Sequence, residues 1–154
     1  MRYRDYKVGF SVEIPDHFSE VREASYEVFN VSEGTLKYFI VLNEDGDILR
    51  SLSFNTEETR VRTKEEFLEL VRKSIAQLED AGMKRVMNDT LTTPSGRELE
   101  RYIMCEVDEE EDFGILIYFT KIKDNLVVSS TPVLEFFDVY ETELFEIYDS
   151  IEEL

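Results

Sequence analysis

The segment GFSVEIPDHF, residues 9–18, decides the fold class because it alternates apolar and polar residues as a half-buried β-strand does. The pair Pro15-Asp16 then ends the alternation with residues that favour a turn. We therefore expect a short strand with one face on a hydrophobic core and one face in water. The apolar positions of this strand are Phe10, Val12 and Ile14.

Further short strands follow, separated by turn-forming residues. Before residue 63 we expect strands at 20–23, 26–31, 36–43 and 48–55, with hairpin turns at 32–34 and 43–47. No connection between them is long enough for a helix, so an antiparallel meander is the simplest topology. A second antiparallel set is expected at 83–91, 99–107, 113–122 and 126–131, closed by Pro132.

Two helices complete the expected pattern. Thr63-Lys64-Glu65-Glu66 is a capping box, an apolar stripe follows it, and Gly82 provides a stop, which together predict a helix over 63–81. From residue 137 to residue 154 apolar side chains recur at helical spacing, with acidic residues away from that stripe. This last segment is expected to form an amphipathic C-terminal helix.

Two of the strands are apolar on both faces, at 113–122 and 38–41, so we expect them to be central and to need cover on both sides. The two helices can cover one face each or share one face. The resulting fold class is α+β, a single domain over residues 1–154 with an antiparallel sheet and two packed helices. The residues expected to be buried are Phe10, Val12, Ile40, Val71, Ile75, Leu78, Ile103, Ile117, Phe119, Leu144 and Ile151.

The net charge of −18 is concentrated in the second half of the chain. Residues 1–77 hold 11 basic and 15 acidic side chains, whereas residues 78–154 hold 6 and 20. Such a field repels nucleic acid and anionic membranes, and no apolar run approaches the roughly 20 residues of a membrane span. A protein partner of basic character fits this charge, although plain solubility also explains it.

Residues that could carry chemistry are few. His17 is the only histidine, in a turn, and Cys105 is the only cysteine, in an apolar strand that favours a buried thiol. The glycines stand singly at turns, without a phosphate loop. We therefore predict a protein that is not an enzyme and that needs no metal or organic cofactor to fold.

The candidate partner patch is the acidic run Asp108, Glu109, Glu110, Glu111 and Asp112. It lacks the ligand spacing and the central glycine of a calcium loop. A solvated hairpin loop explains the run as well as a surface that faces a partner does.

Several segments resemble the Mog/PsbP-like family of α/β/α sandwiches. They are FSVEIPDHF (10–18), TTPSGRELERYIM (92–104), DNLVVSS (124–130) and IYDSI (147–151), in the family's order of strands and helices. That family includes a Ran-binding Mog protein, photosystem extrinsic subunits, DcrB-like lipoproteins and Eag-type secretion chaperones. One departure is Phe18, which stands where the family often has a tryptophan.

The resemblance implies a non-enzymatic protein-binding or accessory module, because the members mostly bind proteins or act as accessory subunits. An alternative is a chaperone-like binder of an apolar segment of a secreted effector, which would need an open groove on the sheet. A purely structural subunit is a further alternative. No DcrB-type lipidation signal precedes the first strand, so we expect a cytoplasmic location.

Overall fold

The computed structural model describes residues 1–25, 27–28, 37–57, 60–106, 114–133 and 137–154. All strand pairings among these residues are antiparallel, which confirms the α+β class. The elements in chain order are β1 (Arg2–Asp5), β2 (Phe10–Glu13), β3 (Ser19–Glu20), the 3-10 helix η1 (Glu23–Ser25), β4 (Lys37–Leu42), β5 (Ile48–Glu57), α1 (Lys64–Asp80), β6 (Met83–Thr92), β7 (Glu98–Glu106), β8 (Gly114–Ile122), β9 (Asn125–Val133), α2 (Phe137–Asp149) and β10 (Glu152–Glu153).

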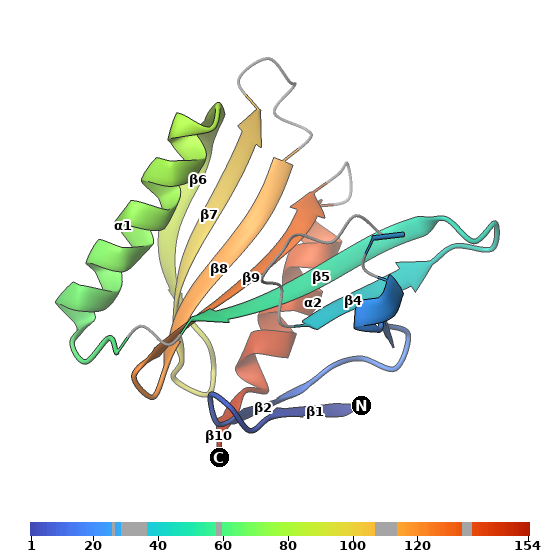
Figure 1. Cartoon of the computed structure of the whole chain (residues 1–154), viewed down its shortest axis with the longest axis horizontal. Coiled ribbons are helices and arrows are strands. Elements are labelled where there is room, and N and C mark those ends of the chain that lie inside the picture. Colours follow the sequence, from blue (N-terminus) through green and yellow to red (C-terminus); the bar gives the residue numbers. More distant parts are fainter. Residues whose placement is uncertain (26, 29–36, 58–59, 107–113, 134–136) are drawn as a thin grey trace.

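The strands form two sheets. The larger sheet has the order β3-β4-β5-β9-β8-β7-β6, and the smaller one has the order β1-β2-β10. In the larger sheet the early strands β3 to β5 and the later meander β6 to β9 join through the pairing of β5 with β9 (Figure 1). Strand β8 is central, as predicted, whereas β4 lies next to the two-residue edge strand β3.

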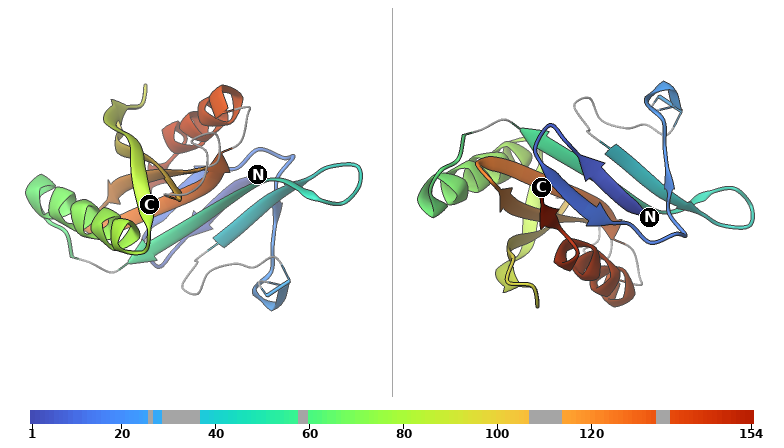
Figure 2. Two further views of the ribbon diagram at one scale, coloured as in Figure 1. Left: turned by 90° about the horizontal axis from the view of Figure 1, so that it is seen from above. Right: turned by 90° about the horizontal axis from the view of Figure 1, so that it is seen from below.

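The larger sheet is covered by one helix on each face, and Figure 2 shows α1 and α2 on opposite sides of it. The face under α1 contributes Tyr102, Met104 and Phe119 to a core with the buried side chains of that helix. The other face packs against α2 and the smaller sheet in a second core. The fold is thus the expected α/β/α sandwich, with the helices divided between the faces. Of the residues expected in the core, ten are buried and Leu78 is half-buried.

Helix α1 begins and ends as its capping residues predict. The Thr63 hydroxyl accepts a hydrogen bond from the Glu66 amide at 3.1 Å, which satisfies one of the unpaired amides of the first turn. The Glu66 carboxylate accepts from the Arg62 amide at 3.0 Å, one residue before the position that a capping box specifies. Beyond the last turn Gly82 adopts φ of 100°, a conformation that glycine tolerates best.

The C-terminal helix is shorter than the prediction, because α2 ends at Asp149. The next residue, Ser150, donates its hydroxyl proton to the Ile147 carbonyl and accepts from the Glu13 amide of β2. Glu152 and Glu153 then pair with the free edge of β2 as strand β10. The prediction of a helix to residue 154 was wrong because apolar spacing does not show that a strand edge competes for these backbone groups.

Three other boundaries also differ from the prediction. Residues 20–23 form only the end of β3 and the start of η1, and residues 27–28 lie in a turn rather than in a strand. The rest of the expected strand 26–31 and the turn 32–34 lie outside the described residues. Pro132 lies within β9 instead of ending it, beyond Ser130, the last β9 residue in register with β5. Proline is tolerated where a strand has lost a neighbour.

Candidate partner-binding surface

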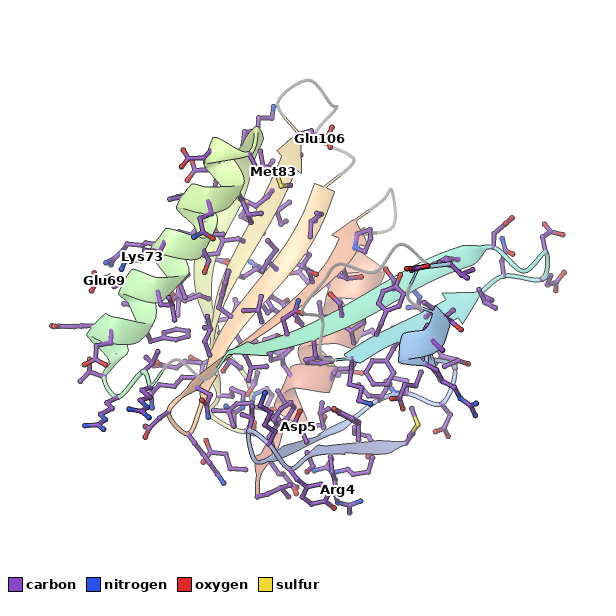
Figure 3. The ribbon with its side chains drawn as sticks, in the orientation of Figure 1. Arg4, Asp5, Glu69, Lys73, Met83 and Glu106 are labelled. Atoms are coloured by element: carbon purple, nitrogen blue, oxygen red, sulfur yellow. The ribbon has the colours of Figure 1, made fainter. Side chains whose placement is uncertain are left out.

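The predicted patch at residues 108–112 lies outside the described residues. Its nearest described neighbours are Glu106, the last residue of β7, and Gly114, the first residue of β8. Figure 3 labels Glu106 near Met83, at the end of the sheet where β6 begins. In the sequence the acidic run falls between these two residues, and its role stays a prediction.

His17 and Cys105 occupy the kinds of position that their sequence context predicts. The His17 ring contacts the Phe18 ring, with 5.0 Å between the centroids, and His17 Nε2 lies 2.9 Å from Glu143 Oε2. The Cys105 side chain is buried within β7. Within the described segments no group of three histidine, cysteine, aspartate or glutamate side chains is arranged to hold a metal ion.

The clearest exposed apolar feature is the end of the β4–β5 hairpin. Leu42 and Ile48 face each other across the hairpin, and Leu49 follows Ile48. Their exposed fractions are 48%, 42% and 47%, so each keeps nearly half of its surface in water. A single exposed apolar side chain is ordinary, but three at one end of a hairpin make this end the candidate contact surface. In Figure 1 this hairpin projects beyond the rest of the larger sheet.

The turn that joins the two strands is held by a single asparagine. The Asn43 side-chain oxygen accepts hydrogen bonds from the amides of Asp45 and Asp47, at 3.0 and 2.9 Å. The Asn43 amide donates to the Asp47 carbonyl, and Gly46 adopts φ of 83°. This is the side-chain to backbone bonding for which asparagine is favoured in turns, so the hairpin predicted at 43–47 is confirmed.

Carboxylates surround the apolar side chains at this end of the hairpin. Glu44, Asp45 and Asp47 are all exposed, and within the described part of the chain none of the three forms an ion pair. The nearest cation along β5, Arg50, donates to Glu143 of α2 instead. The hairpin end therefore presents apolar surface beside uncompensated negative charge.

The base of the hairpin is fixed to the body of the protein. Arg50 Nη1 lies 2.7 Å from Glu143 Oε1, and the same carboxylate contacts His17. The Arg50 guanidinium also lies over the Phe18 ring, 5.5 Å from its centroid. Because both charged side chains are largely buried, this cluster holds β5 against α2 more firmly than an exposed ion pair would.

A second charged cluster lies between α2 and the sheet. Arg101 of β7 pairs with Asp89 of β6 and with Glu141 of α2. Burial raises the pKa of the nearby Tyr118 hydroxyl to about 12, so this group stays protonated near neutral pH. These ion pairs attach α2 to the sheet, because Arg101 pairs with a carboxylate of β6 and with one of α2.

The sequence predicts only a turn at residues 43–47 and gives no sign of the exposed apolar group beside it. Leu42 and Ile48 belong to apolar strands, and the same residue types are buried further along them. Nothing in the local pattern separates the exposed end of the hairpin from its buried base. Only the position of the hairpin beyond the covering layers distinguishes the two.

The geometry defines a sandwich of the Mog/PsbP-like fold, the type that the sequence resembles. A solution structure of cyanobacterial PsbP (CyanoP) from Synechocystis sp. PCC 6803 matches with a TM-score of 0.65 and 16% identity, over 100% of this chain and 92% of that one. The Saccharomyces cerevisiae Ran-binding protein Mog1p matches with a TM-score of 0.55 and 13% identity, over 99% and 94%.

A crystal structure from Bacteroides thetaiotaomicron matches with a TM-score of 0.51 and 12% identity, over 99% of this chain and 48% of that chain. No protein-family model matches the sequence, and no curated protein sequence does either. The similarity therefore lies in the fold alone. Within the described residues, no helix is long and apolar enough to cross a membrane.

Proposed function

We propose that this chain is a non-enzymatic, cytoplasmic protein-binding module that uses its β4–β5 hairpin end to bind a basic protein. The observation that carries the proposal is the group of half-exposed apolar side chains, Leu42, Ile48 and Leu49, beside three exposed carboxylates. Apolar contact supplies affinity, and complementary charge supplies orientation and a faster encounter. The partner surface that fits is an apolar patch surrounded by lysine and arginine.

Two further observations support this class of function. The net charge of −18 favours association with basic proteins throughout the approach of the two molecules. Mog1p, which has a similar fold, is named as a Ran-binding protein, so the fold is compatible with protein binding. A shared fold does not determine the partner, so the hairpin end itself carries the assignment.

The acidic run Asp108–Asp112 is proposed as a second contact that steers the same partner. Replacement of Glu109, Glu110 and Glu111 by glutamine should slow association at low salt. The effect should fade towards 1 M salt, because the Debye length falls from about 10 Å at 0.1 M to about 3 Å at 1 M. An unchanged association rate at low salt would show that this loop is only a solvated turn.

The decisive experiment places a photo-crosslinking amino acid at Ile48 and, in a control, at Lys73. Figure 3 shows Lys73 on the outer side of α1, away from the sheet. We expect one protein to be cross-linked in source cells from position 48 and not from position 73. The purified partner should then bind the Leu42→Ser/Ile48→Ser double variant at least about 30-fold more weakly than the wild type, because each lost apolar contact contributes about 1 kcal/mol or more.

Three results would contradict the proposal. They are the absence of a specific cross-link from position 48, equal capture from both positions, and unchanged affinity of the captured partner for the double variant. A chaperone-like protein would instead capture an apolar segment on the sheet and bind it equally well after the hairpin change. A purely structural subunit would yield no separable partner.

A further inference from the structure

A cavity of about 480 Å³ lies where four separate parts of the chain meet. They are the segment that leads into α1, the turn between β6 and β7, the neighbouring ends of β7 and β8, and Ile151 after α2. Figure 1 shows α1, the β8–β9 turn and the C-terminal segment converging at one end of the molecule, away from the projecting hairpin. The volume is in the range of small-molecule sites, about 300 to 1,000 Å³.

The cavity is cationic although the protein is strongly acidic. Its charged residues are Arg62, Lys64, Arg97 and Lys121, against the single carboxylate of Glu98. The whole chain has 17 basic and 35 acidic residues, so the cavity reverses the ratio found elsewhere. The positive charges of these side chains repel one another unless an anion lies among them.

Carboxylates of the protein neutralise these cations only in part. Lys64 lies 3.4 Å from Glu98, and Lys121 lies 3.8 Å from Asp124. Both pairs are long and both carboxylates are largely exposed, so each ion pair is weak. Arg62 and Arg97 form no ion pair with a carboxylate in the described part of the chain.

Arg97 is the cavity cation whose burial is least balanced by hydrogen bonds and negative charge. Its Nη1 donates to the Lys121 carbonyl at 3.2 Å, but its buried Nε has no hydrogen-bond partner among the described residues. Burial lowers the pKa of the Arg97 guanidinium, and the charge of Glu153 offsets this only in part. A buried donor without an acceptor is destabilising, and an anion in the cavity would supply the acceptor and the missing charge.

The uncharged wall of the cavity indicates the size and kind of ligand. Phe67 of α1 and Ile151 line one side but are more than nine-tenths buried, so they offer a ligand little apolar surface. Ser95 and Gly96 lie in the turn that closes another side. The lining therefore favours a small polar anion over a ligand with a large apolar body.

We propose that this cavity binds a small phosphate compound with at least two negative charges, with Arg62 and Arg97 as its principal ligands. Each phosphate monoester carries about 1.5 to 2 negative charges near neutral pH, and the planar guanidinium matches its oxygens in a bidentate manner. A single carboxylate would leave most of the local positive charge unbalanced. The surrounding acidity excludes acidic macromolecules, which makes a small ligand the fitting occupant.

The test uses pyrophosphate as the probe and citrate as a carboxylate of comparable charge. Titration calorimetry at low ionic strength should show one saturable pyrophosphate site, with weaker citrate binding. The Arg62→Gln/Arg97→Gln variant should bind pyrophosphate at least tenfold more weakly, whereas Lys73→Gln on the outer side of α1 should bind it unchanged (Figure 3). An amide spectrum of each variant checks that the fold persists.

The single variant Arg62→Gln controls for misfolding of the double variant, because Arg62 is exposed and its loss removes no buried contact. It should still weaken pyrophosphate binding severalfold. The proposal is overturned by the absence of saturable binding, by an equal loss in Lys73→Gln, or by an unchanged affinity in both arginine variants. Citrate binding as tightly as pyrophosphate would assign the cavity to polycarboxylates instead of phosphates.

Discussion

The hairpin end lies at the opposite end of the molecule from the elements that line the cationic cavity (Figure 1). The two regions differ in charge, shape and origin. The hairpin end is convex, apolar and acidic, and it is formed by the contiguous residues 42–49. The cavity is concave and basic, and its residues come from positions 62 to 151. A surface built from one local turn needs little from the rest of the fold, whereas the cavity exists only when distant segments pack correctly.

This separation also has an electrostatic consequence. Within the described part of the chain, the acidic hairpin carboxylates form no ion pair with the cavity cations. Each end can therefore attract ligands of the opposite sign. The two ends should act independently, because sites far apart with no shared partners contribute additively.

The largest expected effect is a double dissociation between the two ends. Leu42→Ser/Ile48→Ser should weaken partner binding at least about 30-fold, or about 2 kcal/mol, and leave pyrophosphate binding unchanged. Arg62→Gln/Arg97→Gln should do the reverse. Isothermal titration of each variant with each ligand checks this. If either variant weakens both ligands by the same factor, the two ends are coupled and the comparison fails.

The attachment of the hairpin base gives the next largest effect. Glu143→Ala removes the carboxylate that pairs with the largely buried Arg50, so the free energy of unfolding should fall by about 1.5 to 3 kcal/mol. The matched control is Glu79→Ala, which breaks the exposed pair with Arg85 and should change stability by less than about 1 kcal/mol. Urea denaturation measures both. Equal losses would show that the cluster contributes no more than a surface ion pair.

A smaller effect is expected at the turns of the two ends. Gly46 in the hairpin and Gly96 beside the cavity adopt φ of 83° and 92°, with open space where a Cβ would lie. Replacement of either glycine by alanine should therefore lower the free energy of unfolding by about 1 to 2 kcal/mol, through backbone strain alone. Thermal unfolding should show similar losses of stability in both variants. A much larger loss at one position would reveal a packing demand that the open space does not predict.

The smallest effect concerns acid stability at the cavity end. Asp149 accepts a hydrogen bond from the Ser95 amide at 2.7 Å, and this bond lowers the pKa of Asp149 below its usual 3.8. A carboxylate with a lowered folded-state pKa stabilises the fold above its unfolded pKa and loses that contribution as pH falls through the folded pKa.

Stability below about pH 4 should therefore decline more steeply in the wild type than in Asp149→Asn, with a small difference because Asp149 is partly exposed. Unfolding free energies from pH 2 to pH 6 in urea test this. Identical pH profiles would show that the Ser95 contact is too weak to matter.

Much of the fold could be predicted from local pattern. The capping box and Gly82 located α1, and the alternation around Phe10 and the turn at 43–47 located strands, because these signals act within a few residues. The end of α2 could not be located in the same way. Its apolar spacing continues to residue 154, and only the free edge of β2 shows why the chain leaves the helix after Asp149.

The two candidate sites show the same limit. Arg62 and Lys64 lie close together in the sequence, but no local pattern indicates that Arg97 and Lys121 join them. It also identifies the turn at 43–47 without showing that the apolar residues beside it stay in water. The acidic run at 108–112 remains a prediction from charge alone.

Local sequence patterns predict the α+β class, most strand and helix positions and the buried residues, and the composition gives the acidic charge. Periodicity and turn chemistry are properties of neighbouring residues, so they can be recognised along the chain. Long-range packing sets which strands pair, which helix covers which face, and which cations meet. Those outcomes depend on contacts between distant residues, such as β5 with β9 and β2 with β10, and no local pattern encodes them.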